Sequence, residues 1–160
     1  MADTHAIRVS AAPSDADFAA AMAVMTPAFP PEHGEAWSHQ QLCSMMHLPG
    51  ALLLIGRSGE APVGFALLRC IAGEAELLLL AVHPAHRGLG YGKRLLDRCM
   101  TEAESSGAQT MFLEVREGNP ALRLYSKAGF IQYNIRRDYY MGSNGQRANA
   151  LSLKINLGQD

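Results

Sequence analysis

The stretch of residues 74–100 constrains the fold more than any other part of the chain. It opens with an apolar run over residues 77–82, which is short and typical of a strand buried on both faces. The segment HPAHRGLGYGK follows, with three glycines in five residues. After it, apolar residues recur at helical spacing, at Leu95, Leu96, Cys99 and Met100. The pattern therefore predicts a buried strand that runs through a glycine loop into a helix.

This loop has the chemistry of an anion site. The first N–H groups of a helix have no partner within the helix, and the helix dipole adds positive potential there. Glycines lack Cβ atoms, so a ligand can approach the backbone closely, and flanking basic side chains add charge. The residues of this predicted site are Arg87, Gly88, Leu89, Gly90, Tyr91, Gly92 and Lys93. We expect a phosphate or pyrophosphate ligand there.

The spacing of the loop identifies its type. It is not the dinucleotide pattern G-x-G-x-x-G, and it lacks the G-K-[ST] ending of a P-loop. Arg87, Gly90 and Gly92 form R-x-x-G-x-G, and the motifs FLEV and LYSKAGF follow. In these motifs the chain resembles the GCN5-related N-acetyltransferase (GNAT) family, whose loop of this form holds the pyrophosphate of acetyl-coenzyme A. The resemblance implies acetyl-coenzyme A as the co-substrate and an α/β (α+β) fold, with a central parallel strand pair splayed around it.

Turn and capping signals divide the chain into about seven strands and four helices in a mixed, mostly antiparallel sheet. Strands are predicted over residues 7–11, 51–57, 63–70, 77–82, 111–115, 130–137 and 150–157. Helix start signals lie at residues 13–15, 38 and 118–120, and the glycine loop opens the remaining helix. Strand 111–115 follows a strand–helix crossover, so it should lie parallel to strand 77–82. Segment 26–35, with three prolines and a glycine, is predicted to be a loop.

Composition limits the other function classes. A length of 160 residues suits one domain, residues 1–160, and a formal charge of −1 favours neither nucleic acid nor a membrane surface as partner. The N-terminus shows no basic segment followed by an apolar run, so we expect no signal peptide. The three irregularly spaced cysteines indicate thiols in a reducing compartment, the bacterial cytoplasm. His83 and His86 have no further ligand nearby in sequence, so no metal is expected.

Acyl transfer to an amine needs a proton acceptor and benefits from a proton donor for the leaving thiolate. Glu114 lies within the apolar strand MFLEV, where a charged residue is usually paired or functional, and we assign it as the base. The alternative is a solvated residue on the polar face of the strand. Tyr125 lies in LYSKAGF, a motif shared with many family members, and we assign it as the acid. The alternative is a tyrosine that only packs and hydrogen-bonds the cofactor.

The resemblance also implies the remaining cofactor contacts. The backbone of Leu80, Ala81 and Val82 would pair with the pantetheine arm, with an N–H near Val82 facing the thioester oxygen. Asn119 resembles the asparagine that precedes the short helix and contacts the cofactor. The family spacing from that asparagine to the tyrosine is one residue longer than Asn119 to Tyr125, so Gly118 is the alternative occupant of that position.

Segments spread along the chain resemble one branch of the family more closely, the RimI type, which acetylates the N-terminal alanine of a small-subunit ribosomal protein. The most branch-specific segment is IRRDYY at residues 135–140. The chain departs from the branch at Leu79, and at Ala148 and Asn149, where an acidic pair is usual. An N-terminal amine, with a pKa of about 7.7–8.0, needs a weaker base than lysine at about 10.4. The expected partner is therefore a protein N-terminus.

Four residues are candidates for acceptor binding, each with a plainer alternative. Trp37 lies beside the proline-rich segment and either contacts the acceptor or fills the edge of the core. Glu76 either holds the incoming ammonium or is an ordinary surface carboxylate. Tyr139 and Tyr140 either wall a peptide groove or pack the last hairpin. Two rival functions remain open at this point, an acetyltransferase for a small amine and a non-catalytic acetyl-coenzyme A-binding module.

Overall fold

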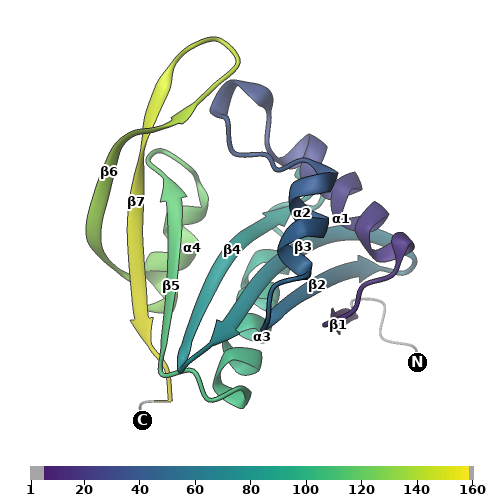
Figure 1. Cartoon of the computed structure of the whole chain (residues 1–160). Helices are drawn as coiled ribbons and strands as arrows, with labels where there is room; N and C mark the ends of the chain where they lie inside the picture. The colour runs from purple at the N-terminus through teal and green to yellow at the C-terminus, as the bar shows by residue number, and fades with distance from the viewer. Residues whose placement is uncertain (1–5, 159–160) are drawn as a thin grey trace.

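The computed structural model describes residues 6–158. The expectation of no signal peptide falls partly on residues 1–5, which lie outside the described range. The strands form one seven-stranded sheet in the order β1-β2-β3-β4-β5-β7-β6 (Figure 1). They are β1 (Ile7–Ser10), β2 (Ala51–Ser58), β3 (Ala61–Ile71), β4 (Glu74–Val82), β5 (Thr110–Arg116), β6 (Ile131–Met141) and β7 (Arg147–Asn156). The helices are α1 (Asp15–Ala28), α2 (His39–Met46), α3 (Tyr91–Ser105) and α4 (Ala121–Ala128), with 3-10 turns η1 (Pro31–His33) and η2 (Pro84–His86).

The predicted fold class is confirmed, since β4 and β5 run parallel and the other paired strands are antiparallel. The helix start signals are also confirmed. Ser14 accepts a hydrogen bond from the Asp17 backbone N–H at 3.2 Å, while the Asp17 carboxylate accepts one from the Ser14 N–H at 3.0 Å. Ser38 begins α2 through the same reciprocal arrangement with Gln41. These capping boxes satisfy N–H groups that the helices leave unpaired.

The prediction of a loop over residues 26–35 was wrong for its first three residues, 26–28, which belong to α1. Helix α1 continues through Pro27 to Ala28, and the Phe29 N–H still donates to the Met25 carbonyl at 3.1 Å. Proline usually disfavours a helix interior, because it lacks an N–H and its ring crowds the preceding turn. Here Met25 and Ala28 are buried against the sheet, and this packing outweighs the local preference. Strand β6 likewise extends past the predicted end at residue 137 to Met141.

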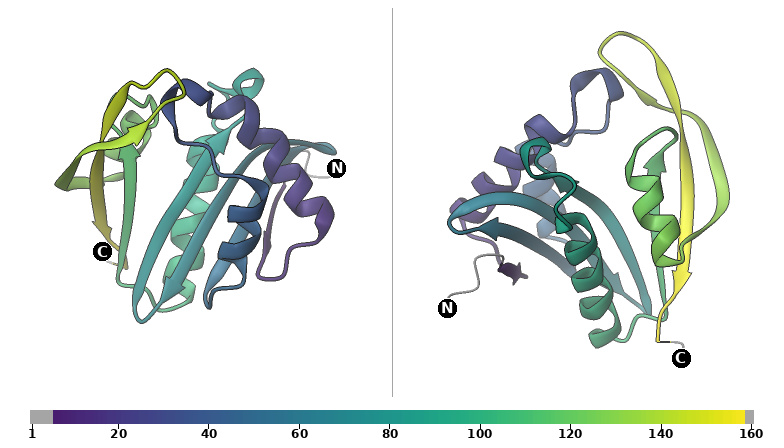
Figure 2. Two further views of the ribbon diagram at one scale, coloured as in Figure 1. Left: turned by 45° about the horizontal axis from the view of Figure 1, so that its top comes forward. Right: turned by 180° about the vertical axis from the view of Figure 1, so that it is seen from behind.

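Two apolar clusters lie on opposite faces of the β2–β4 half of the sheet, under α1 and α2 on one face and α3 on the other (Figure 2). Strand β4 contributes to both, as its apolar run predicted. Leu77 belongs to the cluster with α3, whereas Leu79 belongs to the cluster with α1. Side chains two apart on a strand normally share a face. Residue Leu77 pairs with Leu68 and Leu79 with Leu67, so Leu78 is an extra residue, a β-bulge that reverses the alternation.

Strands β4 and β5 separate soon after they pair. Their register runs only from Glu74 opposite Thr110 to Leu77 opposite Leu113, and the strands diverge beyond it (Figure 1). The predicted splayed pair is therefore confirmed. Across the opening, the loop of residues 29–38 between α1 and α2 meets the β6–β7 turn, where the Ser143 N–H donates to the Pro31 carbonyl at 3.0 Å. No helix within residues 6–158 is long and apolar enough to cross a membrane.

Candidate active site

A cavity of about 500 Å³ lies between the end of β4, the glycine loop and the start of α4, and we call it the glycine-loop cavity. This volume is in the usual range for small-molecule sites, about 300–1,000 Å³. Most of the cofactor-binding residues predicted from the sequence line it, namely Leu80, Ala81, Val82, Arg87, Gly88, Gly90, Tyr91, Gly92 and Asn119. Leu89 and Lys93 do not: Leu89 is exposed, and the Lys93 ammonium binds the Asp97 carboxylate at 2.7 Å. Gly118, the alternative to Asn119, is also outside this lining.

The glycine loop has the backbone conformation that its glycines allow. Gly88 and Gly90 have φ angles of 78° and 89°, and Gly90 is the N-cap of the fifteen-residue helix α3. Residues with a side chain rarely adopt such angles. A Cβ atom built on either glycine meets no atom within 4 Å, so the backbone at both positions is open to a ligand. The loop therefore fits the predicted phosphate group.

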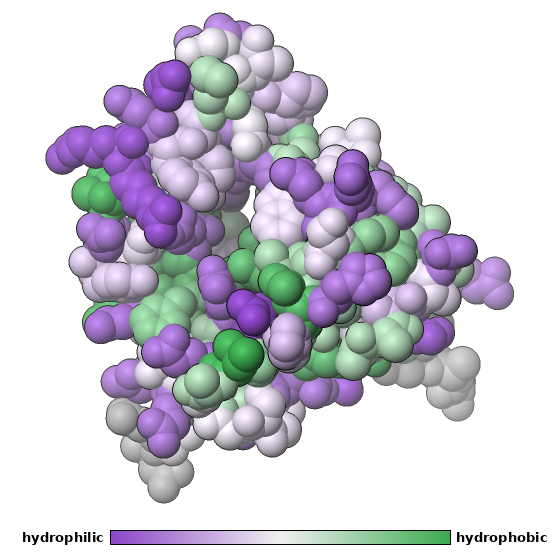
Figure 3. Space-filling view, viewed as in Figure 1, coloured by the Kyte–Doolittle hydropathy of each residue, from purple (hydrophilic) through white to green (hydrophobic). Residues whose placement is uncertain are grey.

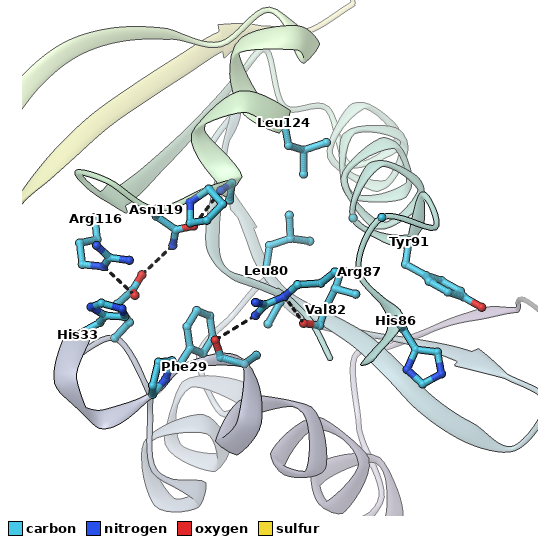
Figure 4. A pocket seen from close by; sticks show the side chains of 18 of the residues that line it. Phe29, His33, Leu80, Val82, His86, Arg87, Tyr91, Arg116, Asn119 and Leu124 are labelled. Atoms are coloured by element: carbon cyan, nitrogen blue, oxygen red, sulfur yellow. Dashed lines mark hydrogen bonds and ion pairs between the residues drawn. The ribbon is translucent and has the colours of Figure 1, made fainter. Parts of the chain in front are cut away.

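Arg87 contributes to the loop in a way that the sequence did not suggest. Its Nε donates to the Val82 carbonyl at 3.2 Å and its Nη2 donates to the Ala28 carbonyl at 3.2 Å (Figure 4). The guanidinium thus joins the end of β4 to the end of α1. The ring of Tyr91 points away from Leu80 and is close to His86, with ring centroids 6.2 Å apart (Figure 4).

A second cavity of about 250 Å³ adjoins the first on the side of β5 and β6, and we call it the tyrosine cavity. Figure 3 shows this face of the molecule hollowed between its two halves. The structure brings together here all the residues predicted to bind the acceptor or to carry the chemistry, Trp37, Glu76, Glu114, Tyr125, Tyr139 and Tyr140. Five residues line both cavities, namely Phe29, Glu35, Leu80, Asn119 and Ala121. A molecule that fills the first cavity can therefore reach the second.

Glu114 faces the tyrosine cavity from β5, and its side chain is 28% exposed. Its Oε1 lies 3.0 Å from Nε of Arg136 on β6, a partner that sequence reasoning did not identify. The side chain of Arg136 is itself 55% exposed. Glu114 is thus a partly exposed carboxylate that lines the tyrosine cavity and forms an ion pair with a partly exposed arginine.

Tyr125 is buried on α4, with its ring edge-on to Phe130 at a centroid distance of 5.8 Å. Burial, followed by the nearby Cys99, Glu35 and Tyr140, raises the pKa of the Tyr125 phenol above its ordinary value. Burial and the carboxylates of Glu35 and Glu114 likewise raise the pKa of Tyr140 to about 12. Both phenols therefore stay protonated at neutral pH, which is the form that donates a proton or a hydrogen bond.

Sequence reasoning missed a partly buried cluster of Glu35, Arg116 and Asn119 between the two cavities. The Glu35 carboxylate accepts hydrogen bonds from Arg116 Nε at 2.9 Å and from Asn119 Nδ2 at 2.8 Å. In sequence, Glu35 was only one of two acids near the proline-rich segment, and its partners lie 81 and 84 residues further along the chain. No local pattern signals such a contact.

Comparisons with known proteins identify the family and several relatives of the chain. A model of the Acetyltransferase (GNAT) family matches residues 18–130. The ribosomal protein bS18-alanine N-acetyltransferase of Haemophilus influenzae is 42% identical over 95 residues, which are 59% of this chain and 65% of that protein. The protein of the same name from Escherichia coli K12 is 32% identical over 127 residues, which are 78% of this chain and 85% of that protein. The chain thus spans slightly under two thirds of the H. influenzae relative.

Solved structures give the same picture for the fold. The crystal structure of the ribosomal-protein-S18-alanine N-acetyltransferase from E. coli superposes with a TM-score of 0.82 and 28% identity, over 97% of this chain and 96% of that one. The structure of yncA from Salmonella typhimurium with its cofactor acetyl-CoA has a TM-score of 0.77 and 21% identity, over 99% and 96% of the two chains.

Proposed function

Because the chain belongs to the acetyltransferase (GNAT) family, we propose that it is an N-acetyltransferase that moves an acetyl group from acetyl-coenzyme A to the α-amino group of a protein N-terminus. The acceptor we propose is the N-terminal alanine of a small-subunit ribosomal protein, the substrate in the names of the H. influenzae and E. coli relatives. We place the reaction in the bacterial cytoplasm, where Cys43, Cys70 and Cys99 persist as free thiols.

The observation that carries the proposal is the junction of two cavities at the point where β4 and β5 separate. Beyond Leu77, β4 has no neighbour on its β5 side within the described residues, so the backbone of residues 80–82 is available to an extended pantetheine arm. The glycine loop at the end of β4 receives the pyrophosphate. This arrangement directs a thioester toward the cavity that holds Glu114 and Tyr125.

In the proposed reaction, Glu114 removes a proton from the acceptor ammonium, directly or through water. The neutral amine attacks the acetyl carbonyl, and backbone N–H groups near Val82 stabilise the oxygen that becomes negative. The C–S bond then breaks, and Tyr125 donates its proton to the departing thiolate. The second proton of the amine nitrogen passes through water to the Tyr125 phenolate, which leaves a neutral amide and restores the phenol. Glu76, on the wall of the same cavity, attracts the incoming ammonium, and Trp37, Tyr139 and Tyr140 enclose the acceptor chain.

The test is thiol release from acetyl-coenzyme A with two peptides of one sequence. The first has a free N-terminal alanine, and the second has a blocked N-terminus and an internal lysine. We expect release with the first peptide and none with the second. Release with a polyamine but with neither peptide would assign the enzyme to small-molecule amines. If the protein binds coenzyme A but releases no thiol from acetyl-coenzyme A with any acceptor, it would be a non-catalytic binding module.

The glycine loop gives a separate prediction for cofactor binding. Gly90→Ala places a Cβ atom at a φ angle of 89°, which costs about 1–2 kcal/mol unless the loop rearranges. Both the strained loop and a rearranged loop would displace the N–H groups at the start of α3. We therefore expect coenzyme A to bind roughly tenfold more weakly in calorimetry.

Gly59→Ala is the matched control for this change. Gly59 also has a positive φ angle, 61°, and open space around it, but it lies in the β2–β3 turn outside both cavities. It should lower the melting temperature to a similar extent and leave coenzyme A affinity unchanged. Equal affinities in the two variants would mean that the loop does not hold the cofactor.

A further inference from the structure

Glu35 and Asn119 line both the glycine-loop cavity and the tyrosine cavity, and Glu35 also contacts Arg116. Figure 4 shows Arg116 and Asn119 at the glycine-loop cavity, with these contacts as dashed lines. The two carboxylate oxygens of Glu35 have separate partners, Oε1 with Arg116 and Oε2 with Asn119. The side chains of Glu35 and Arg116 are only 10% and 12% exposed. Charged hydrogen bonds of this kind are strong, and removing one partner leaves the other charge buried and unpaired. The contact therefore fixes these three side chains relative to one another.

This contact also extends to the start of α4. Glu35 follows η1 in the loop of residues 29–38, whereas Asn119 immediately precedes α4 and its N-cap. While Nδ2 of Asn119 donates to Glu35, its Oδ1 accepts a hydrogen bond from the Ala121 N–H at 2.8 Å. The N-cap residue, Pro120, has no side-chain hydrogen bond of its own. The first turn of α4 is thus capped by a side chain whose orientation Glu35 sets, and Tyr125 lies on that helix.

Glu35 is also the only charged residue among the five described residues that line both cavities. Its carboxylate is not well placed to take the proton of the amine, because both of its oxygens already accept hydrogen bonds from Arg116 and Asn119. Its negative charge nevertheless acts on the site, since it adds to the effect of burial in raising the pKa values of Tyr125 and Tyr140. Those phenols are kept in the protonated form.

We propose that Glu35 is a positioning residue, which holds Asn119 and the first turn of α4 against the loop of residues 29–38 and so aligns Tyr125 at the junction of the two cavities. The role assigned to Tyr125 rests on the proposed acetyl transfer. The clasp itself, meaning the contact of Glu35 with Arg116 and Asn119, does not depend on it.

The first experiment compares Glu35→Gln with a control, Glu32→Gln. Glu32 is an exposed carboxylate on η1, in the same loop of residues 29–38. Glutamine at position 35 can accept only one of the two hydrogen bonds. We expect kcat to fall about tenfold through misplacement of Tyr125, with a change of less than about threefold in the KM for the peptide. Glu32→Gln should match the wild type. Wild-type turnover by correctly folded Glu35→Gln enzyme would overturn the proposal.

A second variant separates positioning from other roles. In the double variant Glu35→Gln with Asn119→Asp the donor and acceptor are exchanged, because the amide introduced at position 35 can donate to a carboxylate at position 119 that still accepts from the Ala121 N–H. Because Asn119 also lines the glycine-loop cavity, kcat is measured with acetyl-coenzyme A saturating for each variant, with Asn119→Asp alone beside it. We expect kcat of the double variant to return to within about threefold of the wild type, above that of either single variant. A double variant no better than Glu35→Gln would contradict the proposal. Loss of the acidic limb of the kcat–pH profile in Glu35→Gln would instead make Glu35 the base.

The clasp can also be tested without turnover, by amide hydrogen exchange. In Glu35→Gln we expect faster exchange in the first turn of α4, at residues 121–124, and unchanged exchange within α3. Unchanged exchange in α4 would overturn the clasp even if the enzyme acetylates peptides. Faster exchange in a protein that acetylates nothing would support the clasp and reject the proposed function.

Discussion

Glu114→Gln should lower kcat for peptide acetylation about 100-fold at pH 7, because glutamine cannot accept the proton that the acceptor ammonium must lose. The substitution keeps the size of the side chain and its contact with the half-exposed Arg136, so we expect the fold and the affinity for coenzyme A to be retained. The measurement is steady-state thiol release over a range of pH, with peptide and acetyl-coenzyme A both saturating.

The pH dependence distinguishes proton removal from other roles of Glu114. An N-terminal amine loses its proton in solution near pH 8, with a pKa of about 7.7–8.0. The deficit of Glu114→Gln should therefore shrink above that pH, where the acceptor arrives already neutral. A deficit that stays the same at pH 9 would mean that Glu114 orients the amine and does not take its proton. Glu117→Gln, at an exposed carboxylate just past the end of β5, is the control and should behave as the wild type.

The parts of this structure that could be predicted from the sequence depend on interactions between residues close together in the chain. A serine that caps a helix bonds to a residue three positions later, as Ser14 does with Asp17, and the signal is contained in four residues. The glycine loop is similar, because its positive φ angles and the unpaired N–H groups of α3 follow from local geometry. These local signals were enough to place the glycine loop at the start of α3, whereas the splayed strands and the cofactor contacts of residues 80–82 and Asn119 were implied by the family resemblance.

The features that could not be predicted depend on packing between distant segments. Helix α1 passes through Pro27 because Met25 and Ala28 are buried against the sheet, and nothing in residues 26–35 reports that burial. The bulge at Leu78 is hidden within a run of four leucines, where a shift of one residue changes no residue type. The contact of Glu35 with Asn119 joins residues 84 positions apart. Such contacts exist only once the sheet has brought the two halves together.

Tyr125→Phe should lower kcat about 100-fold and change coenzyme A affinity by less than about twofold, because it removes a proton donor and leaves the ring in its place. Tyr125 is buried against Phe130, so phenylalanine fills the same space and the melting temperature should change little. Tyr140→Phe is the matched control. It removes a hydroxyl group from the same cavity, and the pKa of the Tyr140 phenol is also raised. We expect this control to change the KM for the peptide more than kcat.

The pH profile of the wild-type enzyme provides an independent check on the role of Tyr125. An acid works only in its protonated form, and burial raises the pKa of this phenol above the ordinary tyrosine value of about 10. Tyr125 therefore remains protonated through pH 9, and kcat at saturating peptide should show no loss from this group below about pH 10. If kcat of the wild type fell near pH 8 and this fall were absent in Tyr125→Phe, the pKa of the phenol would not be raised, which would contradict its burial. Turnover equal to that of the wild type in Tyr125→Phe would remove the acid role and leave the thiolate to depart without a proton from the protein.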